Sequence, residues 1–213
     1  MKRHTSRTRA DTRRSGVSAQ QDRKLIFLIA GVTVALLAAA AAFRTLLTSQ
    51  NHDTVGGPYA LTDGYERAVT QDDFRGRYTL IYFGYTHCVD VCPLTLGTMS
   101  AALDELGPKG RAVTPMFISV DPERDTPPVV QDYVSRFSPR IVGLTGTDRQ
   151  LRPVMDAFHV SAGRHAGNGS GYLIGHSSLL YLMDGRNHLV GMIPVDSSSH
   201  QMAADLSRML PGS

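Results

Sequence analysis

Hydrophobic and polar positions alternate along the chain in blocks that predict strands and helices in turn. Short apolar runs rich in aromatic or β-branched residues predict buried strands. Apolar residues three or four apart between Cys92 and Leu106 predict a helix that ends before Gly107-Pro108. Asp184-Gly185 lies between two further runs and signals a hairpin. The predicted strands are 79–84, 113–120, 141–144, 178–183 and 188–193, and the predicted helices are 92–106, 126–137, 148–158 and 198–210.

Particular residues predict two helix starts and one loop. Thr126 precedes Pro127, which predicts an N-cap followed by proline at the first helical position. Asp148 is the predicted cap of the next helix. Residues 160–171 are rich in Gly and Ser, so we expect a mobile loop there.

The order of these elements predicts the fold class. Three strand–helix units precede a hairpin and a last helix, and such alternation predicts a mostly parallel sheet with helices on both faces. The hairpin adds antiparallel strands. We therefore predict an α/β protein with a thioredoxin-like fold, carrying an N-terminal extension and an added hairpin.

A long uncharged segment precedes this domain. Residues 25–43 are nineteen residues without a charge, about the length that a transmembrane helix needs. Residues 1–24 carry eight Lys or Arg and two Asp. The positive-inside rule then predicts a disordered cytoplasmic arm, one inner-membrane span that contacts lipid, and a periplasmic or extracytoplasmic domain. A cleaved signal peptide is the alternative. Residues 44–57 are the predicted linker and 58–213 the predicted domain.

The charge of the whole chain is misleading. The net charge is +3, yet residues after 24 carry fourteen Lys or Arg against seventeen Asp or Glu. The folded part is therefore acidic, and we expect no nucleic-acid partner. Hydrophobic residues make up 42% of the chain, as in ordinary globular proteins.

The two cysteines of the chain, Cys88 and Cys92, lie where a predicted strand turns into a helix. Functional groups collect at the carboxyl ends of strands in α/β sheets. The helix N-terminus favours anions, so we expect lowered thiol pKa values. A four-residue spacing separates Cβ atoms by about 5–6 Å on a helix, whereas a disulfide needs about 3.5–4.5 Å. The spacing therefore favours metal binding, although a redox-active disulfide remains open.

His176 is the predicted third ligand. It stands between the glycine-rich segment and the hairpin, a position that faces the cysteines in a thioredoxin-like fold. His87 is the alternative imidazole. Two thiolates and one imidazole favour copper(I), and copper(II) is possible with an added oxygen ligand. Asp90 could supply that oxygen or support the site, although capping of the helix is the simpler role.

Three segments in order resemble the SCO/SenC family: FGYTHCVDVCP at 83–93, SVDPERDTP at 119–127 and YLIGHS at 172–177. The resemblance covers about residues 55–210. It implies a copper metallochaperone that delivers copper to the copper A centre of cytochrome c oxidase subunit II, with other copper chaperones as further partners. The family's copper ligands correspond to Cys88, Cys92 and His176.

The resemblance leaves two questions open. Family members also resemble thiol–disulfide reductases, so whether the chain is also an enzyme that reduces the oxidase cysteines is undecided. Two positions depart from the family pattern: Val89 replaces a common proline, and Gly175 replaces a common aspartate. The missing carboxylate affects the expected copper affinity more than the identity of the ligands. In the second segment, Asp121 and Asp125 are expected to order a loop.

Overall fold

The computed structural model describes residues 31–34, 36–39, 55–166, 172–175 and 178–211. It divides into two units, 1–53 and 54–213. In the first unit, 31–34 and 36–39 are helical and exposed. The remainder of the predicted span 25–43, the predicted arm 1–24 and most of the linker lie outside the described residues. Within the described part of the chain, every helix is too short or too polar to cross a membrane.

The second unit contains the predicted alternation of strands and helices. Its elements are β1 (Ala60–Asp63), β2 (Ala68–Thr70), the short 3-10 helix η1 (Gln71–Phe74), β3 (Tyr78–Gly84), α2 (Val91–Glu105), α3 (Pro108–Arg111), β4 (Val113–Ser119), α4 (Pro127–Ser135), β5 (Val142–Thr145), α5 (Asp148–Ala157), β6 (Gly163–Ala166), β7 (Tyr172–Gly175), β8 (Leu179–Met183), β9 (Leu189–Pro194) and α6 (Ser199–Met209).

The main sheet has the strand order β2-β1-β5-β4-β3-β8-β9. Among its described strands, only the β3–β4 and β4–β5 pairings are parallel. The prediction of a mostly parallel sheet was therefore wrong, and the sheet is mixed. The reason is that the N-terminal extension forms strands of its own: β1 pairs antiparallel with both β2 and β5. The predicted hairpin is confirmed as β8 and β9.

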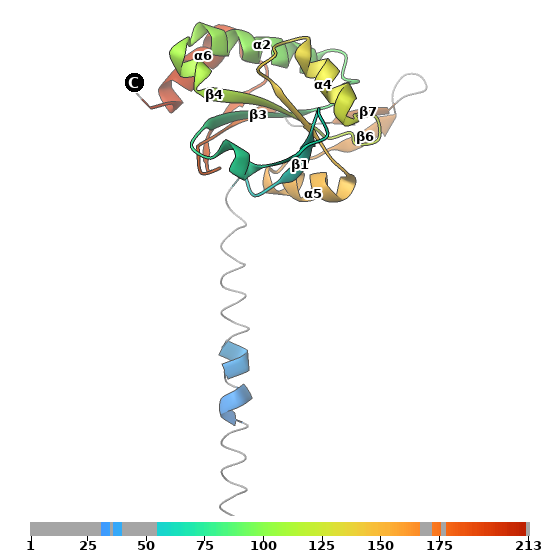
Figure 1. Cartoon of the computed structure of the whole chain (residues 1–213), viewed down its shortest axis with the longest axis vertical. Coiled ribbons are helices and arrows are strands. Elements are labelled where there is room, and N and C mark those ends of the chain that lie inside the picture. The colour runs from blue at the N-terminus through green and yellow to red at the C-terminus, as the bar shows by residue number, and fades with distance from the viewer. Residues whose placement is uncertain (1–30, 35, 40–54, 167–171, 176–177, 212–213) are drawn as a thin grey trace, which may run out of the picture. The chain divides into compact units, whose positions relative to one another are not determined.

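Alternation along β3 divides the core into two clusters. Leu80 and Tyr82 point to the face that α2, α4 and α6 cover. Ile81 and Phe83 point to the opposite face, where α5 packs. Figure 1 shows these helices on opposite sides of the sheet. The thioredoxin-like arrangement with helices on both faces is therefore confirmed, and both faces of β3 are buried.

Two local predictions need correction. Thr147, rather than Asp148, is the N-cap of α5, because it forms a capping box with Gln150. The segment 160–171 is not simply a loop, because β6 within it pairs antiparallel with β7. By contrast, Thr126 is confirmed as the N-cap of α4, with proline at the start of the helix.

Candidate metal centre

The two cysteines follow the carboxyl end of β3: Cys88 lies in the segment between Gly84 and Val91, and Cys92 is the second residue of α2. Cys88 is half-buried and Cys92 is fully buried, and neither is joined in a disulfide. The backbone N–H of Cys92 donates to the Cys88 sulfur at 3.3 Å. The two sulfurs therefore belong to one small site, with Cys88 on its accessible side.

The Cys88 sulfur takes the place that a helix cap would occupy. Asp90 is the N-cap residue of α2, but its side chain makes no capping hydrogen bond and is exposed. The expected capping role of the Asp90 carboxylate was wrong, because the sulfur accepts one of the N–H groups at the helix start instead. Such a donor at a helix N-terminus stabilises a thiolate.

The Cys92 sulfur is enclosed by two residues of β3. The Tyr82 hydroxyl donates to Cys92 Sγ across 3.4 Å. Gly84 leaves room for this sulfur, since a Cβ at that position would lie 2.9 Å from Sγ and 2.8 Å from Phe117 Cε2. The strand and the helix thus fix the position of the buried thiol together.

A hydrogen bond to Cys88, together with burial, reverses the expected acidity of Cys92. The pKa of the Cys92 thiol is raised above its ordinary value, first because it donates a hydrogen bond to Cys88 and second because burial disfavours the thiolate. Hydrogen bonds from the Tyr82 hydroxyl and from the Tyr85 backbone N–H oppose this rise in pKa only in part. The prediction of a lowered pKa was therefore wrong for Cys92. A metal bound here must displace the proton of this thiol.

The loop that carries the cysteines is fixed by Asp125. This buried carboxylate accepts hydrogen bonds from the Thr86 N–H at 2.8 Å, the Thr86 hydroxyl at 2.6 Å and the Ser119 hydroxyl at 2.6 Å. Its backbone carbonyl accepts from Thr145 at 2.8 Å. Asp125 thereby joins the segment after β3 to the segment after β4, which confirms the expected ordering role.

The imidazole of His87 contacts this hydrogen-bond network. Its Nδ1 is 3.7 Å from an Asp125 oxygen and 3.2 Å from the Thr86 hydroxyl. Asp121 completes a cluster of potential ligands with these two residues. However, Asp121 forms an ion pair with Arg124, and the oxygens of Asp125 already accept three hydrogen bonds. We therefore interpret this cluster as a satisfied structural network.

The third predicted ligand, His176, lies outside the described residues. The strand that follows it provides indirect information, because β8 runs antiparallel to β3 with Leu180 opposite Tyr82. The chain therefore enters β8 beside the carboxyl end of β3, which is the end that leads to the cysteines.

Three apolar side chains near the cysteines are exposed, beside the exposed His87 and Asp90. Val89, Val91 and Leu94 have exposed fractions of 79%, 43% and 70%. All three flank the thiols at the start of α2. Exposed apolar side chains gathered in this way are typical of a surface that meets another protein.

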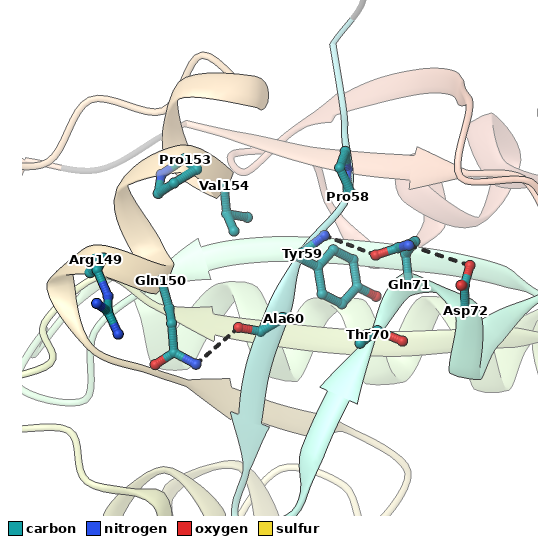
Figure 2. A pocket seen from close by; sticks show the side chains of 10 residues that line it. All are labelled: Pro58, Tyr59, Ala60, Thr70, Gln71, Asp72, Arg149, Gln150, Pro153 and Val154. Atoms are coloured by element: carbon teal, nitrogen blue, oxygen red, sulfur yellow. Dashed lines mark hydrogen bonds between the residues drawn. The ribbon is translucent and has the colours of Figure 1, made fainter.

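A separate pocket lies between β1, η1 and α5 (Figure 2). Several of its polar groups bond to neighbours across it: Gln150 donates to the Ala60 carbonyl at 3.1 Å, and Gln71 accepts from the Tyr59 N–H at 2.9 Å. None of the residues that line it belongs to the cysteine site. We assign no chemistry to this pocket.

The sequence pattern does not mark Tyr82, Gly84 and Thr86 as residues that support the site. One signal was present for Tyr82, because a tyrosine in a fully buried strand needs a partner for its hydroxyl. The identity of that partner depends on how α2 packs on β3, which the sequence pattern does not specify.

The chain is similar to known proteins in sequence and in fold. A family model described as SCO1/SenC matches residues 47–211. The mitochondrial SCO1 homolog 1 of Arabidopsis thaliana is 39% identical over 144 residues, 63% of this chain and 43% of that relative's length. The SCO2-like protein of Rickettsia felis is 35% identical over 150 residues, 70% of this chain and 73% of that protein. The structure of Bradyrhizobium japonicum ScoI with copper bound matches with a TM-score of 0.66 and 40% identity, covering 73% of this chain and 99% of that one.

Proposed function

The chain belongs to the SCO1/SenC family, and we propose that it is a copper metallochaperone that holds one copper ion through Cys88, Cys92 and His176. The observation that carries this proposal is the pair of cysteines around the start of α2, which form no disulfide and are held together by the hydrogen bond from the Cys92 N–H to the Cys88 sulfur. The Bradyrhizobium relative with the same fold was solved with copper bound. In this function copper is cargo to be transferred.

The donor set favours copper(I). Thiolates are soft ligands that select copper(I), and an imidazole completes a three-coordinate site. The register of β8 supports His176 as that imidazole, since the chain enters β8 beside the carboxyl end of β3. The engagement of His87 with Asp125 further favours His176 over His87.

The accessible side of the site suits transfer to another protein. Cys88 is half-buried, and Val89, Val91 and Leu94 are exposed around it. An incoming thiol could therefore reach copper at Cys88 while Cys92 still holds the ion. We propose the cysteines of the copper A centre in cytochrome c oxidase subunit II as the recipient.

We also propose that the domain works at a membrane. Residues 25–43 would be the span, 1–24 a cytoplasmic arm and 44–57 a linker to the extracytoplasmic domain 58–213. The support is the uncharged stretch and the excess of positive charge before it.

Copper(I) titration of the full-length chain tests the function. With the thiols reduced and a competing chelator present, we expect one equivalent of copper(I) per chain. Thiol counting before and after loading should show both cysteines protected by the metal. A reduced chain that binds no copper, or that binds it with both thiols still reactive, contradicts the proposal.

Replacing His176 with alanine separates copper binding from reductase activity. We expect copper(I) affinity to fall roughly 100-fold or more, because one of three bonds to copper is lost. The thiols should stay titratable. In the alternative function, a target disulfide is reduced to two thiols while Cys88 and Cys92 are oxidised to a disulfide. That reaction should continue nearly unchanged in His176→Ala.

His87→Ala is the matched control for this experiment. It removes the other candidate imidazole, which lies one residue from Cys88, and we expect copper affinity close to that of the parent. If His87→Ala loses copper and His176→Ala keeps it, the third ligand is wrongly assigned.

A further inference from the structure

The hydroxyl of Tyr82 contacts the buried Cys92 sulfur from β3, a strand that carries none of the proposed copper ligands. Tyr82 lies in β3 and is fully buried. Its hydroxyl donates to Cys92 Sγ across 3.4 Å. Its ring packs on Phe117, with centroids 6.1 Å apart. The hydroxyl is therefore held in place by the sheet and does not depend on the position of the cysteine loop.

The burial of the Cys92 sulfur makes the hydrogen bond from Tyr82 important. The sulfur has no exposed surface, so water cannot replace the phenol as a donor. Gly84 bounds it closely on the sheet side, where even a methyl group would approach within 2.9 Å. Cys88, in contrast, is half-buried and can exchange partners. The two sulfurs of the site therefore differ in what surrounds them.

A hydrogen bond to a coordinated thiolate changes what that sulfur gives to the metal. The donor withdraws electron density from sulfur, and hydrogen bonding around the cysteine sulfur tunes the potential of copper–thiolate sites. A sulfur that donates less charge stabilises copper(II) less than copper(I). The effect should be large here because the bond lies in a buried environment that water does not screen.

We propose that Tyr82 is a positioning residue that makes the site selective for copper(I), by keeping a hydrogen bond on the Cys92 sulfur when copper is bound. This inference rests on the proposed copper-binding function. It assigns a role to a residue that does not contact the metal, and it predicts which oxidation state the site prefers.

The test is Tyr82→Phe in the full-length chain, with the Cu(II)/Cu(I) couple measured by equilibrium with redox mediators that supply or accept one electron. We expect the ratio of copper(II) affinity to copper(I) affinity to rise roughly tenfold, which is about a 59 mV fall in potential for a one-electron couple. The thiolate-to-copper(II) charge-transfer band should shift as well. A purely structural role for Tyr82 would not move these readouts together.

Tyr133→Phe is the matched control. Tyr133 is another buried tyrosine of the same core cluster, and its hydroxyl has no hydrogen-bond partner among the described residues. Its phenol is within electrostatic range of both cysteines, but removing it deletes the same atom without removing a hydrogen bond to sulfur, so the affinity ratio should shift far less than in Tyr82→Phe. A fluorinated tyrosine in place of Tyr82 donates more strongly and should shift the ratio in the opposite direction, which keeps the test decisive if Tyr82→Phe folds poorly.

The outcomes of these experiments distinguish a failure of the proposed role of Tyr82 from a failure of the proposed copper-binding function. If the parent binds copper and neither the phenylalanine nor the fluorinated variant changes the ratio, the role of Tyr82 is refuted while the proposed function stands. If Tyr133→Phe shifts the ratio as much as Tyr82→Phe, the effect belongs to the core and the assignment is also refuted. A parent chain that binds no copper overturns both proposals.

Discussion

Replacing Cys92 with serine is expected to lower copper(I) affinity on the order of 1,000-fold or more, because a hard hydroxyl is a poor ligand for a soft metal. The cost to the fold should be small. The serine hydroxyl can still accept from Tyr82 in the place where sulfur accepts now. We expect a loss of about 1 kcal/mol in the free energy of unfolding, as is common for a point substitution. Competitive copper(I) titration and urea unfolding measure the two effects separately.

Cys88→Ser and Ser100→Ala complete this experiment. Cys88→Ser should lose copper to a similar extent with less effect on stability, because Cys88 is only half-buried. Ser100 lies on α2, the helix that contains Cys92, and its hydroxyl has no hydrogen-bond partner in the described structure. Ser100→Ala should therefore retain parent-like affinity. A folded Cys92→Ser chain that binds copper as tightly as the parent would rule out a site with two thiolates.

The sequence pattern correctly predicted the helices and the hairpin that depend on interactions between residues close together in the chain. The helix beginning near Cys92 followed from apolar residues that face β3 at helical spacing, and the hairpin followed from the turn at Asp184-Gly185. Thr126 with Pro127 marked the start of α4 correctly. In these cases the signal and the interaction lie within a few residues of each other.

Pairing between distant strands could not be predicted in the same way. β1 and β2 are only four and three residues long, too short to show a clear alternation, yet β1 joins the edge of the sheet at β5. The glycine-rich composition of 160–171 suggested a loop, although Gly163–Ala166 pairs with a strand beyond it. Sequence pattern specifies how a segment folds more readily than which segment it meets.

The site shows the same division between local and distant effects. Cys88 and Cys92 were identified from their place between strand and helix. Their acidity was predicted from the helix terminus alone, which missed the burial and the hydrogen bond that raise the pKa of Cys92. The hydrogen bond between Thr86 and Asp125 joins residues 39 apart in the sequence, and only the fold reveals it.

Replacing Asp125 with alanine should produce the largest loss of stability. The substitution removes the acceptor for the Thr86 N–H, the Thr86 hydroxyl and the Ser119 hydroxyl. Buried donors left without an acceptor cost about 1–3 kcal/mol each, and water that enters the cavity recovers part of this. We therefore expect the free energy of unfolding to fall by roughly 3–5 kcal/mol. Urea unfolding with an unchanged m-value measures it.

Asp132→Ala is the appropriate comparison for Asp125→Ala. Asp132 forms an ion pair with Arg136, but both side chains are more than 60% exposed, so the loss of stability in Asp132→Ala should stay within about 1 kcal/mol. Asp125→Asn keeps the shape of the side chain and one acceptor oxygen. Its loss in the free energy of unfolding should lie between those of Asp132→Ala and Asp125→Ala. Because Thr86 lies two residues before Cys88, release of this loop should also weaken copper binding in Asp125→Asn, even where the chain remains folded. If Asp125→Ala is no more destabilising than Asp132→Ala, the carboxylate does not hold the cysteine loop, and the rigidity of the site must come from the packing of α2 alone.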